Sequence, residues 1–258
     1  MVKKINTTTA QSTDQQDNVE RKLQEQINTI HNLRGPSGVV LPQASYVNLS
    51  LNRLGLSRIL YYADLYRKIL DTSGCVCEFG VRFGDTLSLL TNLRGMFEPY
   101  NYSRRLIGFD TFEGFPSLSS LDTDAHEVGE CTVPTGYEVH LDEILTLHEQ
   151  MSPVAHMKKH ELVKGDATET FPLWLEKNPQ VSIAMAILDM DLYEPTKQVL
   201  QKLLPHMPKG AVLVFDEFSY HHFPGEAIAV KEVLGLHNYR LHINPHQPSC
   251  AWVVIGES

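Results

Sequence analysis

From residue 75 onward, short and mostly apolar runs alternate with turns and with segments that can be helical. Five such runs follow one another: CVCEF (75–79), RLIGF (105–109), HELVKG (160–165), SIAMAIL (182–188) and AVLVF (211–215). Near-continuous apolar runs separated by helical segments are typical of βαβ units, in which helices cover both faces of a parallel sheet. The pattern therefore predicts an α/β fold with these five runs as parallel strands.

Two further apolar runs, YRLHIN (239–244) and CAWVVIG (250–256), end the chain with only a short Pro-His-Gln-Pro-Ser connection between them. A parallel pair needs a crossover of roughly a dozen residues or more, so these two runs should pair antiparallel. The complete prediction is a seven-stranded, mostly parallel sheet with a C-terminal antiparallel strand.

The N-terminal part of the chain lacks strand-like runs. Residues 1–18 are polar and rich in Thr, Gln and Asp, which is typical of a disordered tail. Residues 19–33 and 51–70 carry apolar side chains at helical spacing. In the second stretch the predicted apolar stripe consists of Leu56, Ile59, Leu60, Ala63, Tyr66 and Leu70.

These patterns divide the chain into three parts. We expect a disordered tail over residues 1–18, a helical cap or oligomerisation segment over 19–73, and the main α/β domain over 74–258. The apolar stripe of the second helical stretch permits a subunit interface, so we expect a homo-oligomer.

Composition narrows the class of protein. The chain has 258 residues, with 31 acidic and 22 basic side chains and a formal charge of −9. This acidic balance argues against a nucleic-acid partner, which requires a basic face. No apolar run reaches the ~18 residues of a membrane span, and no apolar stretch follows the basic N-terminus as in a secretory signal. We therefore expect a cytoplasmic protein without a membrane partner, and its four cysteines as reduced thiols.

The first candidate for chemistry is EFGVRFG (78–84), between the first strand and the following helix. Gly80 and Gly84 allow a sharp turn and a close approach to a ligand. The spacing is G-x-x-x-G rather than the G-x-G-x-x-G of dinucleotide sites. Glu78 would be an acid at the end of a buried strand, which suits a ligand amino group better than a pyrophosphate. An ordinary strand–turn–helix glycine pair is the alternative.

Acidic residues also end the second and third strands. Asp110, in FDTFEGFP (109–116), is placed to bind ribose hydroxyls, and Asp166, in KGDAT (164–168), is placed to accept from an adenine amino group. For both residues, a helix cap is the plain structural alternative.

Pairs of carboxylates follow the next two strands. Asp189 and Asp191 end the most apolar run, and Asp216 and Glu217 end the one after it. Since ligands bind beyond the carboxyl ends of parallel strands, all four should converge at one edge of the sheet. Such close like charges need protons or a cation, and oxygen-only ligands suit a hard ion such as Mg²⁺. His221 and His222 follow closely and should border the same cleft as possible substrate contacts, unless they are a chance surface pair.

Taken together, these motifs resemble a known family. EFGVxxG, FDTFEGFP, KGD, LDxDLYEPT and FDEF are similar to the metal-dependent sugar O-methyltransferases typified by macrocin O-methyltransferase, over about residues 74–256. The resemblance implies a Rossmann-like class I fold that uses S-adenosyl-L-methionine. The wording of the motifs is most similar to enzymes that methylate a TDP-rhamnose-type deoxysugar in antibiotic biosynthesis.

The resemblance also implies roles for matching residues. Glu78, Gly80 and Gly84 would hold the methionine part of the cofactor, Asp110 its ribose and Asp166 its adenine. The implied metal ligands are Asp189, Asp216 and Glu217, and the implied general base is Asp191. The family often has two aspartates where this chain has Asp216 and Glu217, so the glutamate is a departure from the pattern.

Other functions remain open at this point. A nicotinamide-dependent nucleotide-sugar oxidoreductase would share the sheet, and Tyr193 and Lys197 have the Y-x-x-x-K spacing of short-chain dehydrogenases. Pro195 lies between them, however, and should start the next helix and leave Tyr193 in the preceding turn. A catechol or another vicinal diol could replace the sugar as acceptor. A non-catalytic binding protein would have to keep its converging carboxylates without a chemical task, which is costly.

Overall fold

The computed structural model describes residues 21–22, 25–26, 43–123 and 126–257. The predicted tail over residues 1–18 lies outside these residues, as does most of the first helical stretch. The chain divides into two compact units, residues 1–57 and 58–258. Helix α2 (Gln43–Ser50) belongs to the first unit, and helix α3 (Arg53–Lys68) matches the second predicted helical stretch. The predicted boundaries at residues 18 and 73 stay a prediction.

All seven predicted strands are present and form one sheet. They are β1 (Cys75–Phe79), β2 (Leu106–Asp110), β3 (His160–Lys164), β4 (Ile183–Leu188), β5 (Val212–Phe215), β6 (His242–Asn244) and β7 (Gln247–Val254). Their order is β3-β2-β1-β4-β5-β7-β6. Strands β1 to β5 pair parallel, whereas β7 pairs antiparallel with both β5 and β6. The predicted α/β class and the antiparallel end of the sheet are therefore confirmed.

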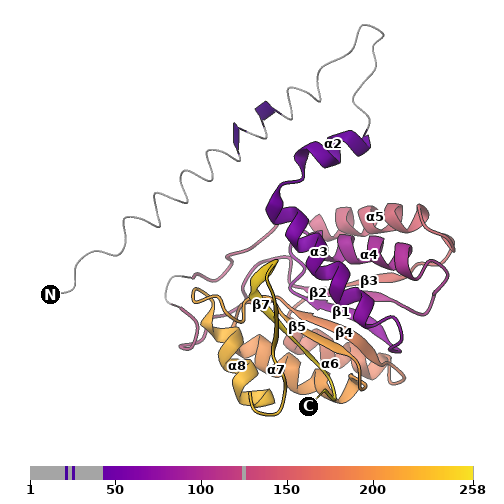
Figure 1. Cartoon of the computed structure of the whole chain (residues 1–258). Helices are drawn as coiled ribbons and strands as arrows, with labels where there is room; N and C mark the ends of the chain where they lie inside the picture. Colours follow the sequence, from indigo (N-terminus) through magenta and orange to yellow (C-terminus); the bar gives the residue numbers. More distant parts are fainter. Residues whose placement is uncertain (1–20, 23–24, 27–42, 124–125, 258) are drawn as a thin grey trace, which may run out of the picture. The chain divides into compact units, whose positions relative to one another are not determined.

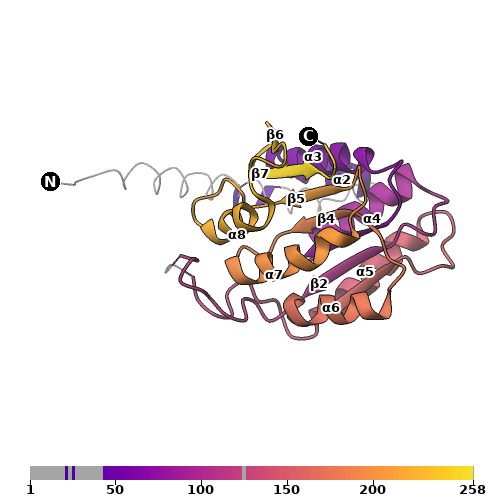
Figure 2. The ribbon, with the colours of Figure 1, turned by 90° about the horizontal axis from the view of Figure 1, so that it is seen from below.

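Helices cover both faces of this sheet (Figure 1). They are α4 (Asp85–Phe97), α5 (Tyr137–Gln150), α6 (Ala167–Lys177), α7 (Tyr193–Leu203) and α8 (Pro224–Leu234), with a short 3-10 turn, η1 (Leu204–His206). Figure 2 shows α6, α7 and α8 side by side on one face, with α3 and α4 on the other. Because the crossovers place helices on both sides, β4 is buried along its whole length, as its apolar run predicts.

The alternation of side chains along the strands divides the core in two. Val76 of β1 packs on the face covered by α3, α4 and α5, whereas Cys77 and Phe79 pack on the face covered by α6, α7 and α8. Cys75 and Cys77 lie on the same strand face as predicted, with their sulfur atoms 3.7 Å apart. Both are free thiols.

The buried stripe of α3 agrees with the predicted one only in part: Ala63 and Tyr66 are buried as predicted, whereas Leu56 and Leu60 are exposed. Its largest buried side chains are Tyr61, Tyr62, Leu65 and Tyr66, whereas Leu60 is 41% exposed. The prediction followed the leucines, but tyrosine rings bury more apolar surface and can satisfy their hydroxyl groups at the edge of the core. Tyr66, for example, donates a hydrogen bond of 2.8 Å to Glu98. The predicted homo-oligomer stays a prediction.

None of the described helices combines the length and the apolar character that a membrane span requires.

Candidate active site

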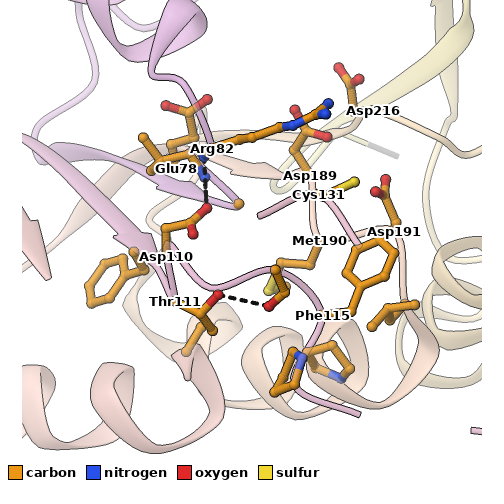
Figure 3. Close-up of a pocket in the computed structure, with 18 of the residues that line it drawn as sticks. Glu78, Arg82, Asp110, Thr111, Phe115, Cys131, Asp189, Met190, Asp191 and Asp216 are labelled. Atoms are coloured by element: carbon orange, nitrogen blue, oxygen red, sulfur yellow. Dashed lines mark hydrogen bonds between the residues drawn. The ribbon is translucent and has the colours of Figure 1, made fainter. Parts of the chain in front are cut away.

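A cleft of about 370 Å³ lies at the carboxyl ends of the parallel strands. This is the edge at which open α/β sheets bind ligands, and the volume lies within the range of small-molecule sites. Figure 3 shows five of the predicted acidic residues around this cleft, Glu78, Asp110, Asp189, Asp191 and Asp216. Asp166, Glu217 and Gly80 also line it. The structure thus brings together most of the residues that the sequence singled out.

Glu78 is buried at the end of β1, with 1% of its surface exposed. Its Oε2 atom is buried and has no hydrogen-bond partner among the described residues. Burial raises the pKa of Glu78 well above its usual value, and the nearby carboxylate of Asp85 raises it further. An unpartnered acid that lines a cleft is a suitable acceptor for a ligand that donates hydrogen bonds.

In the turn after Glu78, the backbone of Gly80 lies directly against the backbone of Asp189. Gly80 has a φ of +92°, and a Cβ atom there would lie 1.8 Å from the carbonyl oxygen of Asp189. Only glycine allows β1 and β4 to approach so closely at this edge of the sheet. Helix α4 then begins at Asp85 with Gly84 as its N-cap in the left-handed conformation, so Asp85 is the first helical residue and not a side-chain cap.

Asp110 holds the glycine turn in place. Its Oδ2 accepts hydrogen bonds from the backbone N–H groups of Val81 at 2.6 Å and Arg82 at 2.7 Å. Its Oδ1 accepts one of 2.5 Å from the N–H of Phe112. The carboxylate therefore joins the loop after β1 to the loop after β2, a contact that the sequence did not reveal, while Asp110 also lines the cleft.

Asp166 is the N-cap of α6. Its Oδ1 accepts hydrogen bonds of 2.8 Å from the backbone N–H and 2.7 Å from the hydroxyl group of Thr168. The simpler alternative, a helix cap, is therefore present in the structure. Because Asp166 also lines the cleft together with Gly165 and Ala167, capping does not remove it from the site.

The carboxylates that follow β4 and β5 lie around the guanidinium group of Arg58. Nη1 of Arg58 donates to Asp216 Oδ1 at 3.2 Å, and Nη2 lies 3.5 Å from Asp189 Oδ2. Tyr62 also donates a hydrogen bond of 3.3 Å to Asp216. Among the described residues, no group of three or more Asp, Glu, His or Cys side chains is arranged so that it could hold a metal ion. In this arrangement, the guanidinium group of Arg58 is the positive charge next to these carboxylates.

The single charge of Arg58 neutralises the acidic residues of this cluster only in part. Burial raises the pKa of Asp189 well above its usual value, with a further contribution from Asp216. Burial and the charge of Asp216 likewise raise the pKa of Asp191 to about 6 and that of Glu217 to about 7. Crowding of like charges in a partly buried cleft is typical of functional sites.

Asp191 has an unusual backbone conformation. Its φ of +64° lies in the left-handed region, which is uncommon for residues other than glycine, although aspartate tolerates it better than most. This turn follows β4 directly and brings Asp191 to the wall of the cleft. Such backbone strain is commonly found where a side chain has to be aimed at a ligand.

Arg58 and Glu226 of this cluster were not predicted. Arg58 comes from α3, 158 residues away from its partner Asp216. Glu226, in the first turn of α8, is fully buried and accepts a hydrogen bond of 3.0 Å from the backbone N–H of Glu217. No sequence motif marks either residue, because each acts through a contact that only the folded chain creates.

The histidine pair lies at the rim. His221 and His222 are exposed and are not among the residues that line the cleft. Their ring centroids are 4.1 Å apart. The carbonyl oxygen of His222 accepts a hydrogen bond from Nε2 of His126, a residue of the loop between β2 and α5 that the sequence analysis missed. A substrate contact for the pair stays a prediction.

The predicted position of Tyr193 is wrong. Helix α7 begins at Tyr193 rather than at Pro195, because proline fits the first turn of a helix without ending it. The Tyr193 hydroxyl group therefore lies one helical turn from Lys197, whose Nζ donates to it at 2.7 Å. The same hydroxyl donates to Glu232 of α8 at 2.8 Å. This pair connects two helices and does not line the cleft, so it gives no support to a dehydrogenase.

Comparison with known proteins identifies the family. The family model for macrocin O-methyltransferase (TylF) matches residues 10–244. The crystal structure of CalS11, a calicheamicin methyltransferase, is 39% identical, with 94% of this chain and 93% of that chain covered and a TM-score of 0.85. An apo structure of CalS11, described as a TDP-rhamnose 3′-O-methyltransferase, is 38% identical over 93% of this chain and 94% of that one, with a TM-score of 0.78.

More distant similarity concerns the fold alone. The O-methyltransferase NovP is 17% identical over 78% of this chain and 80% of that one, with a TM-score of 0.57. None of the curated protein sequences matches the chain. The match to the family model and the identity to CalS11 each extend over most of the chain. The protein is thus a methyltransferase with the class I fold, and it belongs to the macrocin O-methyltransferase (TylF) family.

Proposed function

We propose that the protein transfers a methyl group from S-adenosyl-L-methionine to a hydroxyl group of a deoxysugar in natural-product biosynthesis, with the help of a divalent cation. The observation that carries this proposal is the convergence on one cleft of Glu78, Asp110 and the carboxylates that follow β4 and β5. The similarity to CalS11 supports a TDP-rhamnose-type sugar as acceptor, with a glycoside as the other form of the same substrate class.

The residues of the cleft fit the cofactor. The unpartnered Oε2 of Glu78 matches the amino group of a methionine moiety, which has hydrogen-bond donors to offer. Gly80 lines the cleft beside it, whereas Gly84 does not line the cleft and supports the same turn as the N-cap of α4. We assign the ribose to Asp110 and the adenine to Asp166, both of which line the cleft next to Gly165. When bound, the cofactor supplies a methyl group activated by the neighbouring sulfonium charge.

The donor set also fits a divalent cation by its chemistry. Asp189, Asp216 and Glu217 offer only oxygen atoms, which a hard ion such as Mg²⁺ prefers. Glu217 Oε2 is buried without a hydrogen-bond partner among the described residues, so it has an unused acceptor. When bound, the ion would stabilise negative charge on the acceptor oxygen. In Glu217 the longer side chain replaces the aspartate common in the family and keeps the charge.

Asp191 is the proposed general base. Its carboxylate would accept the proton of the acceptor hydroxyl group as the oxygen–carbon bond forms, because a neutral hydroxyl group is a poor nucleophile. The left-handed turn places the side chain at the cleft wall. The same cleft has an apolar wall suited to the C–H face of a deoxysugar, formed by Phe115, Pro116 and Phe223.

A methyl-transfer assay tests this proposal. The protein is incubated with labelled S-adenosyl-L-methionine, Mg²⁺ and TDP-rhamnose, and the product is identified by mass. We expect a singly methylated sugar nucleotide whose formation stops with EDTA and resumes with added Mg²⁺. Methylation of a catechol but of no sugar would contradict the proposed acceptor, and full activity in EDTA would contradict the proposed metal.

A further inference from the structure

Arg58 makes most of its contacts with groups of the candidate active site. Its side chain is 26% exposed and reaches from α3 into the cleft. Nη1 contacts both carboxylate oxygens of Asp216, at 3.2 and 3.4 Å. Nη2 lies 3.5 Å from Asp189 Oδ2 and donates to the hydroxyl group of Thr86 at 2.8 Å. The guanidinium group thus joins the strand ends of β4 and β5 to the first turn of α4.

The position of this group is fixed from several sides. Tyr62, one helical turn further along α3, lies under the guanidinium with its ring centre 5.1 Å away. The same tyrosine donates a hydrogen bond to Asp216. Asp85 is 3.8 Å from Nε, on the side facing α4. Arg58 is therefore held among three carboxylates and an aromatic ring, an arrangement built for a positive charge.

These contacts engage carboxylate oxygens of the proposed metal ligands. Asp189 and Asp216 are two of the three proposed metal ligands, and Arg58 contacts both of them directly. A divalent cation within coordination distance of these oxygens would meet the guanidinium charge a few ångströms away, and the two positive charges would repel each other. The guanidinium and the cation therefore compete for these carboxylates through charge repulsion.

We propose that Arg58 is a positioning residue that competes with the divalent cation for Asp189 and Asp216. The guanidinium keeps the two strand ends aligned, and it yields their oxygens when a cation binds. Its hydrogen bond to Thr86 gives it a second anchor outside the metal ligands. This inference rests on the proposed use of a metal, and it predicts that Arg58 lowers the affinity for the cation.

Binding of Mn²⁺ alone tests the inference, with free Mn²⁺ measured by electron paramagnetic resonance and without substrate. We expect Arg58→Gln to bind Mn²⁺ about tenfold more tightly or better, because a competing charge is removed. Arg58→Lys, which keeps the charge, should stay near the wild-type affinity. The matched control is Arg67→Gln on the same helix, where Arg67 is 54% exposed and pairs with Asp64 outside the cleft. Unchanged or weaker binding by Arg58→Gln would overturn the inference.

A second measurement does not depend on a variant that folds. In the wild-type protein, the Nε–H resonance of Arg58 should shift when Mg²⁺ is added, since its carboxylate partners change. An unmoved resonance at saturating Mg²⁺ would contradict the competition.

Binding of S-adenosylhomocysteine to the same samples separates the two proposals. If wild type and Arg58→Gln both bind it but neither binds Mn²⁺, the metal and this inference are wrong while methyl transfer stands. If wild type binds Mn²⁺ but no S-adenosylhomocysteine, the proposed cofactor site is wrong.

Discussion

Asp110 combines two tasks in one side chain. A carboxylate has about four lone-pair positions, and three backbone N–H groups engage Asp110. The residue therefore builds the turn on which Gly80 and Glu78 depend and still presents an edge to the cleft. The sequence predicted only the second task, because the first depends on amides about 30 positions away in the chain.

Asp191→Asn should separate catalysis from binding. The amide keeps the size of the side chain but cannot take a proton, so we expect turnover to fall by roughly 10²–10⁴-fold. The dissociation constant for S-adenosylhomocysteine, measured by calorimetry, should stay within about threefold of the wild-type value, since it is set by other residues. Asp71→Asn, at an exposed position away from the cleft, is the control. Near-normal turnover of Asp191→Asn would mean that another group is the base.

Gly80→Ala tests the close approach of β1 and β4. The added Cβ would lie 1.8 Å from a backbone oxygen, so we expect a loss of about 3 kcal/mol or more in the free energy of unfolding. Gly129→Ala is a matched control, because Gly129 has a similar φ of +85° but no atom within 4 Å of the added Cβ. It should cost only the backbone strain, about 1–2 kcal/mol. If urea unfolding gave the same loss of free energy for both variants, backbone strain and not the close approach to Asp189 would explain the effect at residue 80.

At the scale of elements, the turn between α3 and β1 is held by one buried arginine. Arg104 is 3% exposed and bonds to Glu98, to the carbonyl oxygens of Ile69 and Thr72 at 2.9 Å each, and to that of Gly74. The next residue, Arg105, instead forms a half-exposed pair with Glu161. Arg104 and its neighbour Arg105 should therefore contribute very differently to the stability of the fold.

Arg104→Met should destabilise the protein by about 3–5 kcal/mol, because it leaves Glu98 buried without its counter-charge. Arg105→Met should cost no more than about 1 kcal/mol, as is usual for exposed pairs. Both values follow from urea unfolding monitored by circular dichroism. A similar, small cost for both substitutions would contradict the role given to Arg104.

His126 connects the loop between β2 and α5 to the segment before α8 through hydrogen bonds. Its Nδ1 lies 2.9 Å from Glu130 Oε2, and its Nε2 lies 3.2 Å from the carbonyl oxygen of His222. Both partners are acceptors, so only the protonated ring can donate to both. The ring also stacks on Phe223 at 4.3 Å, next to Phe115. Burial by itself would lower the pKa of His126, but these acceptors and the charge of Asp191 raise it overall.

The stabilisation that His126 provides should decrease as the pH rises. Because the pKa of His126 is raised on folding, its stabilising effect is complete below the unfolded-state pKa and is lost as the pH passes the folded-state value. We expect the advantage in melting temperature of wild type over His126→Gln to stay constant up to about pH 6.5, the usual histidine pKa, and to shrink as the pH rises above it. His140→Gln, at an exposed position on α5, should show no such trend. A constant difference for His126→Gln would contradict the charged state.

The elements themselves were predicted to different degrees. All seven strands follow from apolar runs, since burial on both faces leaves a clear pattern. The stripe of α3 was right for Ala63 and Tyr66 but wrong for Leu60, because hydrophobic spacing alone favours Leu60 whereas packing selects Tyr61 and Tyr62. Helix α7 begins earlier than predicted, because a proline within the first turn does not mark the first residue.

At the scale of the whole molecule, topology explains why the site was largely predictable. Parallel strands place their carboxyl ends at one edge, so acids that follow strands must meet there. Glu78, Asp110, Asp166, Asp189 and Asp216 all line the same cleft for this reason. Strand topology does not determine which side chains reach this edge from the helices. Arg58 and Glu226 therefore appear only once the chain is folded.

The most direct measurement for the whole account is a calorimetric titration with S-adenosylhomocysteine, with NAD as the control ligand. We predict micromolar binding of S-adenosylhomocysteine and no binding of NAD, because the cleft has an unpartnered acid and lacks the G-x-G-x-x-G turn of dinucleotide sites. Glu78→Gln should weaken the binding by at least about tenfold. Binding of NAD without S-adenosylhomocysteine would contradict the account of the cofactor site.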